Sequence, residues 1–130
     1  MNTKLDKIFA EISAGELADK ITILEIKKEK IEDVQKLKDV NKELLSLNET
    51  FKKFIDKNKI KDLLIKLKEI NLRLWDIEND KRKAEKKNVF DENFIQLARN
   101  VYKTNDQRAE IKLKINEVLG SNIKEVKSHY

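Results

Sequence analysis

The near-absence of helix-breaking residues constrains this chain more than any other feature of its sequence. The 130 residues contain no proline, and the only two glycines, Gly15 and Gly120, lie near the two ends. Almost nothing between them interrupts a helix. Charged residues make up 41% of the chain and apolar residues 39%, a balance typical of long amphipathic helices. We therefore predict an all-α protein.

Capping residues predict where the helices begin and end. Ser13 and Glu16 form the pattern of a capping box, in which the Ser13 hydroxyl accepts from the Glu16 amide and the Glu16 side chain reaches back. Asp33 and Asp91 are predicted to cap the second and fourth helices at their N-termini. Gly120 fits the position that follows a helix C-terminus.

Apolar spacing divides the region between these caps into helical segments. Residues 37–54 and 63–77 carry apolar residues at alternating spacings of three and four, as in a heptad repeat. Residues 56–59 predict a turn between them, and the charged run 80–87 predicts fraying at the end of the third helix. The alternative is that the second and third segments merge into one long helix, which would leave three helices and favour a dimer.

Four amphipathic segments joined by short turns predict an antiparallel up-down bundle of about four helices. The whole chain, 1–130, would form one domain, with residues 1–12 as an N-terminal arm and residues 121–130 as a polar C-terminal tail. The first helix has apolar residues on more than one face, so we expect it to be the most buried of the four.

Several functional classes are excluded by what the sequence lacks. There is no cysteine, and the one histidine, His129, lies at the extreme C-terminus, so neither a Cys/His metal site nor a Ser/His triad is expected. The net charge of +5 is spread among 29 basic and 24 acidic residues, which disfavours nucleic acid as a partner. No apolar run approaches the roughly 20 residues of a membrane span, and no signal peptide is visible. A cytoplasmic protein without cofactor or metal is the expectation.

Three blocks of the sequence resemble a known family. Residues 13–27 (SAGELADKITILEIK) look like the N-terminal signature of a family of small uncharacterised bacterial and phage proteins. Residues 71–78 (NLRLWDIE) and 97–108 (LARNVYKTNDQR) match later blocks of that family in the same order. The family is a domain of unknown function, so the resemblance implies a small helical protein and no assigned activity.

The last predicted helix has polar residues on its apolar stripe. At about 100° per residue, one arc of this helix contains five apolar residues and three polar ones; these are Phe94, Ala98, Val101, Ile115 and Leu119, with Asn105, Arg108 and Lys112. A charge on a core stripe is costly unless it is paired or holds a ligand. We therefore treat this stripe as the candidate site.

Polar residues on other helices are expected to meet this stripe. Folding the last hairpin about residues 88–89 places Asn71 level with Arg108, and a parallel first helix would place Lys27 at a similar height. The full set of candidate ligand-binding residues is Lys20, Lys27, Asn71, Glu78, Asn105, Arg108 and Lys112. Counted against Glu16 and Glu78, its cations leave an excess of two positive charges, which suits an anionic small molecule such as a carboxylate or phosphate.

Other interpretations of these residues stay open at this point. Arg108 could pair with Glu78 in a purely structural network, with the lysines extended to solvent. In an enzyme, Arg108, Lys27 and Lys112 would clamp an anion while Glu78 acted as acid or base. The pairs Glu16-x-x-Asp19 and Glu29-x-x-Glu32 resemble Mg²⁺-binding spacings, although 24 acidic residues make such spacings common.

The sequence favours a non-enzymatic binding or interaction module over an enzyme, because no catalytic motif accompanies the polar stripe. Its partner would be an anionic small molecule or another protein. Apolar residues on secondary faces of the first helix, Ile23 and Ile26, also allow a homodimer.

Overall fold

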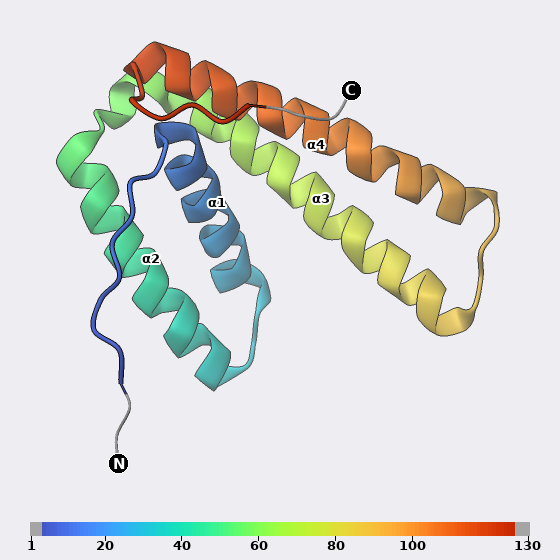
Figure 1. Cartoon of the computed structure of the whole chain (residues 1–130). Coiled ribbons are helices and arrows are strands. Elements are labelled where there is room, and N and C mark those ends of the chain that lie inside the picture. Colours follow the sequence, from blue (N-terminus) through green and yellow to red (C-terminus); the bar gives the residue numbers. More distant parts are fainter. Residues whose placement is uncertain (1–3, 127–130) are drawn as a thin grey trace.

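The computed structural model describes residues 4–126 and consists of helices joined by short turns (Figure 1), as predicted. Residues 1–3 and 127–130, which include His129 and the ends of the predicted arm and tail, lie outside the described residues. No strand occurs among the described residues. The elements are α1 (Ala14–Lys30), α2 (Val34–Phe54), the short 3-10 helix η1 (Lys57–Ile60), α3 (Lys61–Lys87) and α4 (Glu92–Leu119).

The predicted cap positions are confirmed by their hydrogen bonds, but the capping box at Ser13 is formed in one direction only, because the Glu16 carboxylate pairs with Lys112 instead of reaching back. Ser13 Oγ accepts from the Glu16 amide at 3.1 Å, and Asp33 and Asp91 each accept from the amide three residues further on. Gly120 ends α4 in the left-handed conformation, with φ 64°. Local sequence chemistry therefore fixes where these helices start and stop.

The connection between α2 and α3 is a break, so the four-helix arrangement is confirmed and the merged helix is not formed. Asp56 caps η1 by accepting from the Asn58 amide at 3.1 Å. The expected fraying at residues 80–87 is wrong, because α3 stays helical through Lys87 and is closed by Asn88 in the left-handed conformation, with φ 53°. This run remains helical because its inner side chains, such as Ala84, pack half-buried in the α3–α4 hairpin.

The four helices form two antiparallel hairpins that meet at one end and diverge at the other, so that the molecule is V-shaped (Figure 1). The first hairpin consists of α1 and α2, and the second of α3 and α4. Helix α1 packs against all three other helices, whereas α2 packs mainly against α1. The structure therefore places α1 at the centre of the bundle, as its several apolar faces predicted.

The core consists of two apolar clusters, one within the first hairpin and one that joins α1 to the second hairpin. Helix α1 contributes to both. One face of α1 gives Leu17, Ile21 and Leu24 to a cluster with Val40 and Leu44 of α2. The adjoining face gives Ala18 to a cluster shared with η1, α3 and α4; its other buried members are Ile60, Leu67, Ile70, Ile111 and Ile115. None of the helices among residues 4–126 is both long and apolar enough to cross a membrane.

The helices differ in length, and this leaves part of the second hairpin uncovered. At about 1.5 Å per residue, the 17 residues of α1 span roughly 25 Å, whereas the 27 residues of α3 and 28 of α4 span roughly 40 Å. All the buried residues of α4 lie from Thr104 onward, on the half that α1 covers. Beyond the end of the contact with α1, the α3–α4 hairpin has no third layer.

Candidate binding site where the hairpins meet

A buried carboxylate, Asp19 of α1, lies at the centre of the polar residues. Its side chain is 1% exposed and accepts from Arg108 of α4 through Nε at 3.1 Å and Nη2 at 2.8 Å. The Asn71 side-chain amide of α3 donates to the same carboxylate at 2.9 Å and to the Thr22 hydroxyl at 2.8 Å. One acidic side chain therefore joins α1, α3 and α4, and the fork of Arg108 matches the carboxylate geometry.

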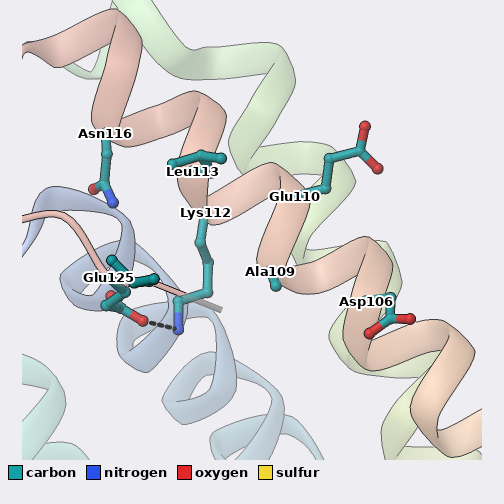
Figure 2. A pocket seen from close by; sticks show the side chains of 8 residues that line it. Asp106, Ala109, Glu110, Lys112, Leu113, Asn116 and Glu125 are labelled. Carbon is teal, nitrogen blue, oxygen red and sulfur yellow. Dashed lines mark ion pairs between the residues drawn. The ribbon is translucent and has the colours of Figure 1, made fainter. Parts of the chain in front are cut away.

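Lys112, one turn along α4 from Arg108, lies between two further carboxylates. Its Nζ is 2.6 Å from Glu16 of α1. It also lies 2.9 Å from Glu125 of the tail, the ion pair drawn in Figure 2. Burial lowers the pKa of Lys112, but the hydrogen bonds to Glu16 and Glu125 outweigh it, so the pKa lies above its ordinary value. For Glu125, burial raises the pKa, but hydrogen bonds from Ser13 and Lys112 outweigh it, so the pKa lies below its ordinary value.

We call the residues linked in this way the junction cluster; they are Ser13, Glu16, Asp19, Asn71, Arg108, Lys112 and Glu125. It contains three carboxylates and two cations, so it carries one excess negative charge. The predicted excess of two positive charges does not describe this cluster, because Asp19 and Glu125 belong to it whereas Lys20, Lys27 and Glu78 do not. Charge pairing makes the cluster a means of holding the hairpins in place.

The first turn of α1 is tied to the end of α4 and to the tail by its backbone amides. The Gly15 amide donates to Asn116 Oδ1 at 2.6 Å, and the Ala14 amide donates to Ser121 Oγ at 3.1 Å. These bonds satisfy donors that a helix N-terminus leaves unpaired. A Cβ on Gly15 would collide with the Lys112 carbonyl oxygen, so only glycine allows this approach.

A groove opens beside the junction cluster, where the two hairpins part. It encloses about 380 Å³ between α1, α3 and α4. Its lining has an apolar and a polar part: Ile23, Ile26, Leu74 and Trp75, with Asn71, Glu78, Asn79, Arg82 and Arg108. Asn71 and Arg108 belong to both the groove and the junction cluster, so the cluster positions two side chains of the groove wall.

Three of the seven predicted site residues, Asn71, Glu78 and Arg108, line this groove, whereas Lys112 lies in the junction cluster. Asn105 is exposed and accepts weakly from Arg108 Nη1 at 3.4 Å. Lys20 is exposed and Lys27 half-buried, and neither forms an ion pair within residues 4–126.

Two expectations about these residues are wrong: one ion pair and the height of one helix. Arg108 pairs with Asp19, and Glu78 pairs with Lys81 at 3.6 Å, so the expected Arg108–Glu78 pair is not formed. Asn71 does lie level with Arg108, but Asp19 occupies the position expected for Lys27. This eight-residue offset amounts to about 12 Å along α1. It arises because Gly15 docks the start of α1 directly onto α4.

Sequence reasoning missed Glu125 of the junction cluster and Arg82 of the groove, and it also missed Asp19 at the centre of the cluster. A signal for Asp19 was available, since the small residues Ala14, Gly15 and Ala18 mark the face of α1 that can approach another helix closely. The Mg²⁺ interpretation used Asp19 and Glu16, but both carboxylates are engaged by cations of α4. Within the described residues, no group of three or more His, Cys, Asp or Glu side chains is placed to hold a metal ion.

A second cleft, of about 440 Å³, lies between α4 and the tail (Figure 2). Lys112 and Glu125 form its inner wall, so it adjoins the junction cluster. Glu110, on its outer wall, pairs with Lys114 at 3.7 Å. The cleft is thus the space left beside the ion pair that fastens the tail.

Comparison with known proteins gives one match. A family model described as "Family of unknown function (DUF6165)" matches residues 8–130. No curated protein and no solved structure matches the chain.

Proposed function

The chain belongs to the DUF6165 family, a family of unknown function, and we propose that it is a non-enzymatic binding module. In this proposal, the groove between the hairpins receives a ligand that carries an anionic group, a carboxylate or a phosphate. The junction cluster has a separate role, which is to hold the groove walls in register.

The division of roles follows from how the cations are paired. Arg108 and Lys112 are engaged by carboxylates of the junction cluster. Arg82 lines the groove and is exposed, and within residues 4–126 it forms no ion pair. An arginine beside apolar side chains in a concave site is well suited to bind an anionic group. The unpaired Arg82 guanidinium is the observation that carries the proposal.

Binding is favoured over catalysis by the titratable groups of the groove. Its lining contains two arginines, which stay protonated, and one carboxylate, Glu78. The enzyme alternative needs Glu78 as acid or base, and Glu78 does line the groove. However, its side chain is 43% exposed and pairs with Lys81, so it lacks the enclosed setting in which catalytic carboxylates usually act.

Trp75 offers a direct test, since it is the only tryptophan and lines the groove. We expect benzoate and phenyl phosphate to change Trp75 fluorescence saturably, and neutral benzyl alcohol to bind more weakly. Replacing Arg82 with glutamine should weaken anion binding by about tenfold or more, since hydrogen bonds to charged groups contribute about 1.5–3 kcal/mol.

The matched control is Arg99→Gln, which removes an exposed arginine of α4 that lines none of the described clefts. It should leave the affinity unchanged. The proposal is overturned if neither anion gives a saturable change, or if Arg82→Gln binds the anions as tightly as the unchanged protein does.

A further inference from the structure

We propose that the ligand of the groove is zwitterionic, a free α-amino acid with an apolar or aromatic side chain. Its carboxylate would bind Arg82, its ammonium group would bind Glu78 and Asn71, and its side chain would lie against Trp75. This inference rests on the proposed function and specifies the ligand class.

The groove presents both signs of charge on adjacent turns of α3. Glu78 and Arg82 are four residues apart, a spacing at which opposite charges commonly pair on a helix surface. They form no ion pair with each other, since Glu78 instead pairs with Lys81 at 3.6 Å. A cation and an anion thus line one cavity without neutralising each other, which suits a ligand that carries both charges.

Arg108 adds little free positive charge to this lining. Its Nε and Nη2 groups donate to the buried Asp19 carboxylate, and only Nη1 is left, with a weak contact of 3.4 Å to Asn105. The charged groups that the groove offers a ligand are therefore the Arg82 guanidinium, which forms no ion pair within residues 4–126, and the Glu78 carboxylate, whose ion pair with Lys81 is long, at 3.6 Å. Such a lining favours a monoanionic carboxylate accompanied by an ammonium group over a dianionic phosphate.

Asn71 supplies a hydrogen-bond acceptor to the groove. Its Nδ2 donates to Asp19 and to Thr22, and the Asp19 carboxylate can only accept, so the orientation of the amide is fixed. Its Oδ1 has no hydrogen-bond partner among the described residues. Every fully buried side-chain oxygen of those residues does have a hydrogen-bond partner. Oδ1 is therefore not fully buried, and because Asn71 lines the groove, the three donors of an ammonium group could use this oxygen together with Glu78.

The remaining lining accounts for the apolar side chain of the ligand. Ile23 and Ile26 of α1 line the groove together with Leu74 and Trp75 of α3. The enclosed volume, about 380 Å³, lies within the range of about 300–1,000 Å³ found for small-molecule sites, so it has room for an amino acid. Trp75 adds a flat surface on which an aromatic side chain can stack.

Three related compounds separate the contributions of the two charges. Phenylalanine carries both groups, 3-phenylpropionate lacks the ammonium group, and phenethylamine lacks the carboxylate. We expect phenylalanine to change Trp75 fluorescence with an affinity about tenfold higher than that of either analogue, since each analogue leaves one charged group of the groove without its partner.

Two variants assign each charge to its side chain. Glu78→Gln should remove the advantage of phenylalanine over 3-phenylpropionate, and Arg82→Gln should remove its advantage over phenethylamine. The controls are Asp76→Asn, an exposed carboxylate on α3 that does not line the groove, and Arg99→Gln; both should bind like the unchanged protein.

The outcomes distinguish this inference from the proposed function. If 3-phenylpropionate binds as tightly as phenylalanine, or if Glu78→Gln leaves the preference intact, the zwitterionic ligand is refuted while anion binding stands. If the two carboxylates and phenyl phosphate all fail to bind, both proposals are refuted. A tenfold preference that each variant removes for its own analogue supports the inference.

Discussion

Replacing Asp19 with alanine tests whether one buried carboxylate holds the two hairpins together. The change removes the acceptor shared by Arg108 and Asn71. Breaking a buried ion pair from one side typically costs about 3–5 kcal/mol. The cost is reduced here because the Arg108 side chain is 29% exposed and can turn to water, while Asn71 keeps its bond to Thr22. We expect a loss of about 3 kcal/mol in the free energy of unfolding.

This loss is large enough to measure by thermal or urea unfolding. At about 2.1 cal/mol/K per residue, the unfolding entropy of the 130-residue chain is roughly 0.27 kcal/mol/K. Each kcal/mol then lowers Tm by about 4 °C, so Asp19→Ala should lower it by about 11 °C. Asp39→Ala is the matched control, since Asp39 is an exposed aspartate inside α2, and it should change stability by less than about 0.5 kcal/mol.

A double variant tests whether the stability lost in Asp19→Ala comes from leaving Arg108 without its carboxylate partner. In Asp19→Ala combined with Arg108→Met, no buried guanidinium is left without its carboxylate, and methionine keeps much of the apolar stem. The double variant should therefore be more stable than Asp19→Ala alone. The reasoning is refuted if Asp19→Ala costs less than about 1 kcal/mol beyond Asp39→Ala, or if the two changes at Asp19 and Arg108 are simply additive.

Two further predictions concern the start of α1 and the tail. Gly15→Ala should destabilise the protein by about 1–3 kcal/mol in urea unfolding, despite alanine's higher helix propensity, because its Cβ meets the Lys112 carbonyl; equal or greater stability would contradict the close approach. Glu125 should stabilise the folded state above the ordinary carboxylate pKa and lose this effect as the pH falls through its lowered folded pKa. Glu125→Gln should thus be less stable than the unchanged protein at pH 7 and match it in acid; a difference that persists in acid would contradict this.

Local features of the fold could be predicted from the sequence because their causes are local. The caps at Ser13, Asp33 and Asp91 depend on one side chain and an amide three residues further on. The break near Asp56 likewise follows from a short polar stretch between two apolar seams. These signals do not depend on how the helices later pack, so the four helices were identified correctly.

The junction cluster could be predicted only in part, because its geometry depends on the heights and rotations of separate helices. The prediction that Asn71 and Arg108 lie at the same height was correct, because the short turn of one hairpin determines it. The height of α1 is set by contacts between residues about 100 positions apart, such as Gly15 with Asn116, and no apolar periodicity encodes these. Because α1 has apolar residues on several faces, its sequence pattern did not indicate which face packs against α4. Asp19 was overlooked for this reason.

The fastening of α1 to the C-terminal tail has a consequence for synthesis on the ribosome. The partners of Ser13, Ala14 and Gly15 lie 101 to 112 positions later in the chain. The nascent hairpin of α1 and α2 can form early, but its leading end stays open to solvent until residues 116–125, which supply these partners, have been added. At about 5–20 residues per second, this interval lasts several seconds, and during it the first-made half relies on its own apolar contacts.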